Sequence, residues 1–348
     1  MTVERKYLTA VPVFKFLLIL GVVLIHSNPA SQICDENGNC GFVFVDFVTS
    51  FMQTCVPSFY IISGYLFFIN IGRPSATYLH KLKSRVRTLL IPYLVWNSIC
   101  AALFVIKVKY LGFPGLGIIE DGTIDWGKFF LGFIYRQQAD GYPFAFAFYF
   151  IRNLMLFVLL SPTVWFISRR WWTMCLFILM KIVFDLNLLG IEWFVIGSAA
   201  GIHRFSFEKI NSRLAAIVSF AVYIAFGYVR FFTDDLSENM SQSLLVIEVL
   251  AAFYSVYFIS QKLSSLSQKP GVMKTLCSST FFIYAFHQLF CSVTVKFWLR
   301  IFGTGSFAGP VLTYVFSFLT MFFISFAIYM SAQRICSRIL STITGGRE

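Results

Sequence analysis

Lys15 and His26 lie in the first long apolar segment of the chain, which runs from residue 8 to residue 26. Eleven helical residues make about three turns, so the two side chains lie within roughly 20° of one helix face and about 16 Å apart along the axis. An ionisable side chain costs several kcal/mol in hydrocarbon, so a pair in one membrane-spanning helix indicates a functional site. The alternative is that Lys15 extends toward one membrane surface while His26 lies in the outer headgroup layer.

The composition is that of a polytopic membrane protein. Of 348 residues, 58% are hydrophobic, 19% aromatic and 13% charged, the mean hydropathy is +0.75, and phenylalanine alone occurs 43 times. Lipid permits only helices or a closed barrel, and the apolar runs here are about twenty residues long without alternation. The sequence therefore predicts one all-α transmembrane bundle over residues 1–348, with no separate soluble domain and no cleavable signal peptide.

The apolar runs predict ten spans, and the charges orient them. The spans lie near residues 8–27, 43–71, 88–106, 144–167, 171–187, 188–202, 214–232, 243–260, 276–299 and 308–332. With the N-terminus inside, the inner segments hold most of the Lys and Arg residues, as the positive-inside rule requires. Both termini are then cytoplasmic, and the net charge of +12 reports membrane orientation and not nucleic-acid binding.

The predicted extracytoplasmic loops have two notable features. The loop over residues 107–143 is the longest, and two interpretations of it stay open: a cap over an outward-facing site, or a plain surface loop. Cys34 and Cys40 flank a short turn and are candidates for a disulfide in an oxidising compartment. The eight cysteines show no paired spacing typical of a metal site.

A second histidine, His287, also lies within a predicted span. Histidine titrates near neutral pH, which suits a general base that takes a proton and returns it. A single buried histidine is more often a hydrogen-bonded structural residue. The presence of His26 and Arg152 in the same bundle favours a catalytic site instead.

Other intramembrane charges have a structural interpretation. Lys181 and Asp185 are four residues apart, which predicts that they neutralise each other on one helix. Asp46 and Glu248 lie near predicted span ends, where contact with water is expected.

The densest basic stretch lies on the predicted cytoplasmic side and comprises Lys81, Lys83, Arg85 and Arg87. On a helix these residues form two i,i+4 pairs in adjacent columns, which suits a polyphosphate ligand. The alternative is a topology anchor or a contact with anionic lipid headgroups. The sequence contains no Walker-type loop, dinucleotide fingerprint or HExxH zinc motif.

Five motifs in order resemble acyltransferase family 3, the bacterial integral-membrane O-acyltransferases, and the resemblance covers nearly the full chain. They are Lys15 with His26, residues 57–66 with Ser63, residues 87–93 followed by Trp96, residues 149–154 running to Ser161-Pro162, and Ile283-Tyr284 with His287. The chain departs from the family pattern at two places. Lys15 stands where the family has Arg, and the basic stretch lacks a strict Arg-x-x-Arg.

The resemblance implies transfer of an acyl group, usually acetyl, from cytoplasmic acyl-CoA to a hydroxyl of an extracytoplasmic glycan or lipid-linked sugar, at the inner membrane. Acyl-CoA is then a substrate, and neither a metal nor a bound cofactor is implied. His26 would be the general base or a transient acyl carrier, and Lys15 would stabilise the donor or the charge developing at the thioester carbonyl.

The resemblance also implies binding residues. The CoA phosphates would be held by Lys83, Arg85 and Arg87. The acceptor or the pantetheine arm would be positioned by Arg152, His287 and Ser63. Two other function classes stay open: a secondary transporter whose intramembrane Lys, His and Glu relay protons, and a sensor that only binds acyl-CoA. Transporters often show inverted repeats and matched Gly- or Pro-broken helices, and the sequence shows neither.

Overall fold

The structure is a computed structural model that describes residues 9–30, 42–69, 81–136, 141–184, 186, 188–207, 212–233, 236–268 and 271–346. The cysteine pair Cys34 and Cys40, and Asp185, lie outside these residues. The helices of the first half are α2 (Val11–Ile25), α3 (Val43–Met52), α4 (Cys55–Phe68), the π-helix η2 (Val86–Leu90), α6 (Ile91–Leu111), α7 (Trp126–Leu131), the 3-10 helix η3 (Phe146–Phe148) and α8 (Tyr149–Leu159).

The remaining helices are α9 (Ser161–Ser168), α10 (Trp171–Val183), α11 (Ile191–Ile202), α12 (Arg213–Phe232), α13 (Glu238–Gln268), α14 (Val272–Phe286), the 3-10 helix η5 (His287–Leu289), α15 (Cys291–Phe302), α16 (Ala308–Ile335) and α17 (Ser337–Thr344). The strands of the described part are β1 (Ile119–Glu120) and β2 (Thr123–Ile124), which form an antiparallel hairpin. The predicted all-α architecture is thus correct except for this hairpin.

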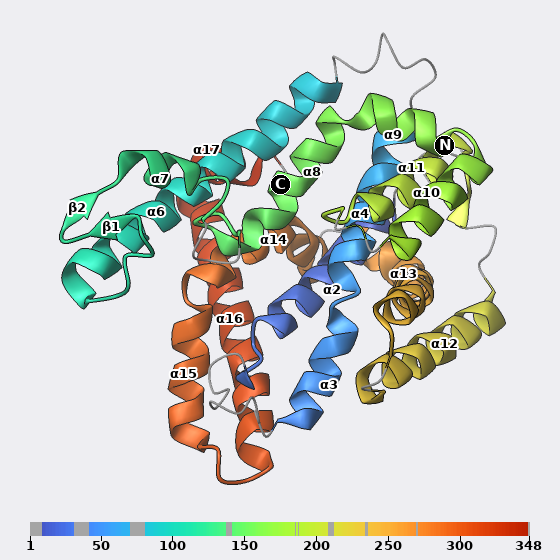
Figure 1. Cartoon of the computed structure of the whole chain (residues 1–348). Helices are drawn as coiled ribbons and strands as arrows, with labels where there is room; N and C mark the ends of the chain where they lie inside the picture. Colours follow the sequence, from blue (N-terminus) through green and yellow to red (C-terminus); the bar gives the residue numbers. More distant parts are fainter. Residues whose placement is uncertain are drawn as a thin grey trace.

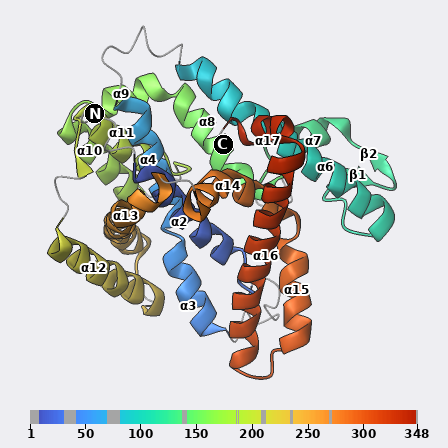
Figure 2. The same cartoon turned by 180° about the vertical axis from the view of Figure 1, so that it is seen from behind.

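Helix α2 is the central element (Figure 1). It packs against α3, α4, α13, α14 and α16, and Figure 2 shows the same surroundings from behind. Val13, Phe14 and Val23 of α2 have no exposed surface. A helix that is apolar nearly all round is typical of the middle of a bundle, and its few polar side chains must therefore face an internal space.

Among the described helices, α4 and α11 have the most extensive contact with each other. A Cβ atom on Gly64 would collide with the carbonyl of Phe194, and one on Gly197 would collide with the carbonyl of Ile61. Small residues at a crossing let two membrane helices approach closely. This close packing fixes the position of α4, the helix that carries Ser63.

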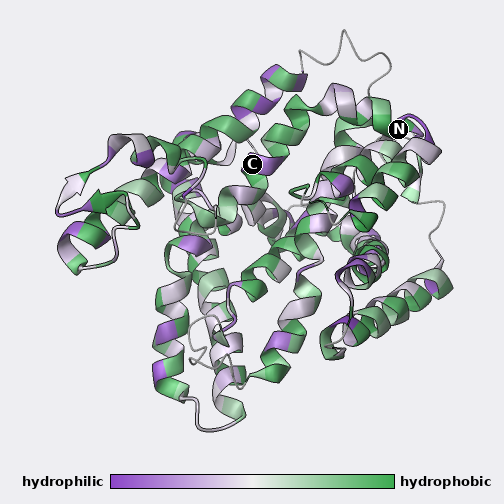
Figure 3. Cartoon of the chain, in the orientation of Figure 1, coloured by the Kyte–Doolittle hydropathy of each residue, from purple (hydrophilic) through white to green (hydrophobic). Residues whose placement is uncertain are grey.

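The chain is a multi-pass membrane protein. Five described helical segments are long and apolar enough to span a membrane: residues 43–68, 81–111, 213–232, 238–266 and 308–335. Hydrophobic residues predominate along most helices, including the outer ones (Figure 3), and Leu214, Ile217 and Phe220 of α12 are each more than half exposed. Such a surface is suited to lipid and not to water.

Two predicted spans are bent, so that the count rises to seven if each bent pair is one span. Between α8 and α9 the axis turns by 72°, and Pro162 at the start of α9 explains this break because it lacks an N–H. Between α14 and α15 the axis turns by 65° at the 3-10 turn that begins with His287. Broken helices in membranes are tolerated where the freed backbone lines a cavity or is buried in protein.

The predicted fifth and sixth spans correspond to short helices. Helices α10 and α11 have 13 and 12 residues, which makes them about 20 and 18 Å long against a hydrocarbon core of about 30 Å. Together with α2, they are apolar but too short to qualify by length. The ten-span topology therefore stays a prediction.

Glu248 is buried, so the expectation that it contacts water is wrong. It lies inside α13, has no exposed surface, and forms a 2.7 Å ion pair with Nε of Arg230 on α12. Lys181 is also buried, and its Nζ donates a hydrogen bond to Oε1 of Gln242 at 2.5 Å. Only Asp46 lies near a helix end as expected, where it accepts a hydrogen bond from Nδ2 of Asn28 at 2.7 Å.

Candidate active site

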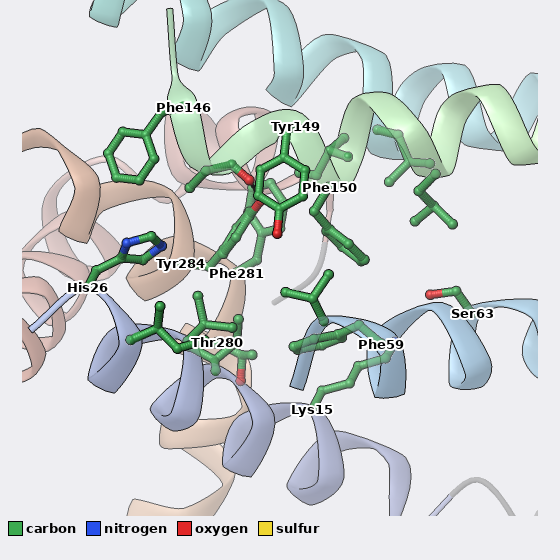
Figure 4. A pocket seen from close by; sticks show the side chains of 18 of the residues that line it. Lys15, His26, Phe59, Ser63, Phe146, Tyr149, Phe150, Thr280, Phe281 and Tyr284 are labelled. Carbon is green, nitrogen blue, oxygen red and sulfur yellow. Dashed lines mark hydrogen bonds between the residues drawn. The ribbon is translucent and has the colours of Figure 1, made fainter. Parts of the chain in front are cut away.

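A cavity of about 570 Å³ runs along α2 (Figure 4). The α2 side of the cavity includes Val11, Lys15, Ile19, Val22 and His26. These positions recur every three or four residues, so they share one helix face. From Val11 to His26 the helix rises about 22 Å, which is most of the hydrocarbon thickness. Lys15 and His26 therefore line one cavity, as their eleven-residue spacing predicts.

The other walls come from α4, η2, η3, α8 and α14, together with Arg85 before η2 and Tyr142 before η3. They are mostly aromatic and aliphatic. The polar residues on these walls are Ser63, Arg85, Tyr142, Tyr149, Ser278, Thr280 and Tyr284. Figure 4 shows His26 beside Phe146 at one side of the view and Lys15 and Ser63 at the other. The cavity is thus a long apolar passage with a cation-bearing part and an imidazole-bearing part.

His26 is fixed by the end of α2. Its amide donates to the carbonyl of Val22, and its ring lies edge-on to Phe146 at a centroid distance of 5.0 Å. Two residues later, Asn28 donates to Asp46 at the start of α3. The His26 ring thus lies on the cavity wall in a short segment that is fixed on both sides.

His287 lies next to His26 but outside the cavity lining. The two ring centroids are 5.3 Å apart with an interplanar angle of 31°. His287 has no exposed surface, and its Nδ1 is 3.1 Å from the carbonyl oxygen of Ile283. Its Nε2 has no hydrogen-bond partner among the described residues. Neither histidine predicted from sequence is isolated, because the fold brings them together from α2 and η5.

Lys81 and Arg85 lie one helical turn apart on one face, as their i,i+4 spacing predicts. The π-helix η2 begins immediately after Arg85 and shifts the register of the following turn. Arg85 lines the cavity, whereas Lys83 and Arg87 are exposed and do not. Lys81 donates a hydrogen bond to the carbonyl of Phe67 at the end of α4 and lies 5.3 Å from that ring's centroid.

A family model described as an acyltransferase domain (Acyl_transf_3) matches residues 9–330. The chain belongs to acyltransferase family 3. The match covers every residue of the cavity lining, and the protein is therefore an O-acyltransferase of the membrane.

A curated relative has a similar length. The succinoglycan biosynthesis protein ExoH of Rhizobium meliloti (strain 1021) is 27% identical over 355 residues, which cover 96% of this chain and 90% of the relative. No solved structure matches this family 3 acyltransferase.

The motif at residues 283–287 and the following Gln288 stabilise one wall of the cavity by hydrogen bonds to Ala147. The Tyr284 hydroxyl donates to the carbonyl of Ala147, and Oε1 of Gln288 accepts from the Ala147 amide at 3.1 Å. Tyr284 also stacks on Phe148 with ring planes 3° apart. Tyr284 and Gln288 thus hold η3 against α14 and η5, and the motif residue His287 lies between them in sequence with its ring beside His26.

Arg152 does not line the cavity. Its NH1 donates to the carbonyls of Ile134 and Gly141, at 2.8 Å each, and its Nε donates to Asn153 at 3.1 Å. Arg152 therefore holds the end of the 107–143 loop next to Tyr142, which lines the cavity. The hairpin and α7 extend to one side along α6 (Figure 1), and Tyr142 is the residue through which the described part of the loop contributes to the cavity lining.

Several lining residues were not predicted from the sequence. Ser278 and Thr280 belong to a run of three hydroxyl residues in an otherwise apolar segment, which was a usable signal. Tyr149 opens one of the family motifs, whereas nothing in the sequence distinguishes Tyr142. Among the described residues, no group of three or more His, Cys, Asp or Glu side chains could hold a metal ion.

Proposed function

We propose that this enzyme transfers an acetyl group from cytoplasmic acetyl-CoA to a hydroxyl of an extracytoplasmic polysaccharide or of its lipid-linked precursor. The proposal rests on one observation, the single cavity that is lined by Arg85 and Lys15 and also by His26. The full-length similarity to a succinoglycan biosynthesis protein supports a polysaccharide acceptor.

The proposal includes a ten-span topology in the inner membrane with both termini in the cytoplasm. The five long helices, the two bent pairs and the three short apolar helices correspond in order to the ten predicted segments. The excess of Lys and Arg in the predicted inner segments supports the orientation. In this orientation Arg85 faces the cytoplasmic side and His26 lies toward the outer side.

Arg85 would bind a phosphate of CoA, with Lys83 and Arg87 attracting the donor at the membrane surface. Lys15 would contact the donor between Arg85 and the thioester. About 16 Å along α2 separates Lys15 from His26, so Lys15 stabilises the donor and does not contact the carbonyl attacked beside His26. Ser63 would position the pantetheine arm on the same wall, and Arg152 would act through Tyr142.

His26 would remove the proton from the acceptor hydroxyl. The oxygen then attacks the thioester carbonyl, the new C–O bond forms as the C–S bond breaks, and the proton passes from His26 to the departing thiolate. In the alternative route, His26 attacks first, releases CoA and carries the acyl group to the acceptor. Both routes need the imidazole on the cavity wall, where it lies.

The test uses the purified protein in nanodiscs with acetyl-CoA and an oligosaccharide from the producing cell. We expect free thiol to appear and His26→Ala to abolish it, while His203→Ala, which alters an exposed histidine stacked on Trp171, leaves it unchanged. Mass spectrometry of glycans from cells with and without the gene should show one lost acetyl or succinyl increment. Solute uptake by vesicles without thiol release would instead support the second candidate function, a secondary transporter. The two bent helix pairs favour that candidate, because broken helices are common in transporters.

A further inference from the structure

His287 has one ring nitrogen whose protonation state the structure defines. Its Nδ1 lies 3.1 Å from the carbonyl oxygen of Ile283. A carbonyl only accepts hydrogen bonds, so Nδ1 must carry the proton. Neutral imidazole has one protonated nitrogen, so Nε2 carries a lone pair.

That lone pair is buried and lacks a partner among the described residues. His287 has no exposed surface and does not line the cavity. Leaving a buried acceptor unpaired costs free energy, so buried unpaired groups often mark catalytic sites or a bound water. The neighbouring ring is His26, whose centroid lies 5.3 Å away.

We infer that His287 is a positioning residue for His26: the adjacent His26 ring turns to donate one N–H to Nε2 of His287, a hydrogen bond that the structure itself does not contain, and its other nitrogen is then left unprotonated for the cavity. This inference rests on the proposed function. It follows the general arrangement in which a base is oriented by a third group. A neutral partner fits an apolar surrounding, because it adds no buried charge.

The backbone explains why a histidine at this position can act in this way. His287 begins the 3-10 turn at the 65° break between α14 and α15, where Tyr284 and Gln288 are both attached to Ala147. The bond to Ile283 then fixes the ring orientation. The position of the proton acceptor is therefore built into the break of the helix.

Three variants separate this role from packing. His287→Gln supplies an amide oxygen near the Nε2 position, His287→Asn keeps a donor near the Nδ1 position only, and His287→Phe fills the space with neither. We expect kcat to stay within about 10-fold of wild type for Gln and to fall about 100-fold for Asn and Phe, with the KM for acetyl-CoA within about 3-fold throughout. His203→Asn is the matched control.

A purely structural role predicts the opposite order, because Asn preserves the bond to Ile283, and Asn as active as wild type would overturn the inference. If the wild type releases no CoA at all, the proposed function fails instead. Should the variants unfold, 15N spectra of the histidine-labelled wild type, which has four histidines, decide the matter. One fixed tautomer for His26 is expected, and a mixture of tautomers would contradict the inference.

Discussion

Lys15 and His26 line one cavity from a single helix, about 16 Å apart along its axis. Under the proposed function, this separation gives Lys15 and His26 different parts of the substrate to contact. A cation three turns from the imidazole cannot stabilise the same reacting carbon, but both can contact one extended donor molecule. Under the proposed function, the catalytic centre is a passage with a donor-binding part and a reacting part, and not a compact cluster.

Lys15→Met should therefore raise the KM for acetyl-CoA by about 10- to 100-fold and leave kcat nearly unchanged, because a contact to a charged group contributes about 1.5–3 kcal/mol to binding. Lys15→Arg keeps the charge and should stay close to wild type. Steady-state kinetics of thiol release distinguish the two parameters. A fall in kcat at constant KM would place Lys15 at the reacting carbonyl instead.

Arg85 should contribute more to acetyl-CoA binding than Lys83 and Arg87 do. It lines the cavity, whereas Lys83 and Arg87 are exposed, and exposed charges are screened by salt. We expect Arg85→Gln to raise the KM for acetyl-CoA about 10-fold or more, and Lys83→Gln and Arg87→Gln to change it less than about 3-fold at 0.15 M salt. Equal effects for all three substitutions would show that the donor binds at the surface and not in the passage.

Arg152 should act on the loop and not on the donor. Arg152→Met removes the hydrogen bonds to the carbonyls of Ile134 and Gly141. The amides of residues 132–136 and 141–146 should then exchange hydrogen for deuterium faster, while those of α2 stay protected. The KM for the acceptor should rise because Tyr142 loses its support. Unchanged exchange in this loop would show that the hydrogen bonds do not hold it.

The ion pair between Arg230 and Glu248 should be structural. Because Glu248 has no exposed surface and the Arg230 side chain is only 16% exposed, Glu248→Met leaves a largely buried arginine without its carboxylate and should lower the free energy of unfolding by about 3–5 kcal/mol. The double variant with Arg230→Met should recover most of that loss. Denaturant unfolding in detergent measures both, with activity per folded molecule as the control. A double variant less stable than the single one would assign the pair a stabilising role of its own.

The sequence predicted the helical fold and the shared face of Lys15 and His26, because both follow from the 3.6-residue period within one segment. It did not predict that Arg85 is the one cation of its basic stretch that lines the cavity, since that depends on which side of the stretch faces the other helices of the bundle. It also did not predict the buried partners of Glu248 and Lys181. Those pairs join different helices, and hydropathy along one segment contains no information on what the neighbouring helix supplies.

The two bends had unequal signals in the sequence. Ser161-Pro162 marks the first break, because proline cannot donate the helical hydrogen bond. The second break, at His287, has no proline or glycine. It is fixed by contacts of Tyr284 and Gln288 with Ala147, which lies far away in the sequence. The proximity of His26 and His287 follows from this bend, so it was accessible only from the folded structure.

The most direct test of the central claim is transfer across a sealed membrane. Proteoliposomes receive labelled acetyl-CoA only on the side of the Lys81–Arg87 stretch and the glycan acceptor only on the other side. We predict label on the acceptor with the wild type and none with His26→Ala. Label that appears only when donor and acceptor share one side, or that persists in His26→Ala, would contradict a passage in which His26 joins the two substrates.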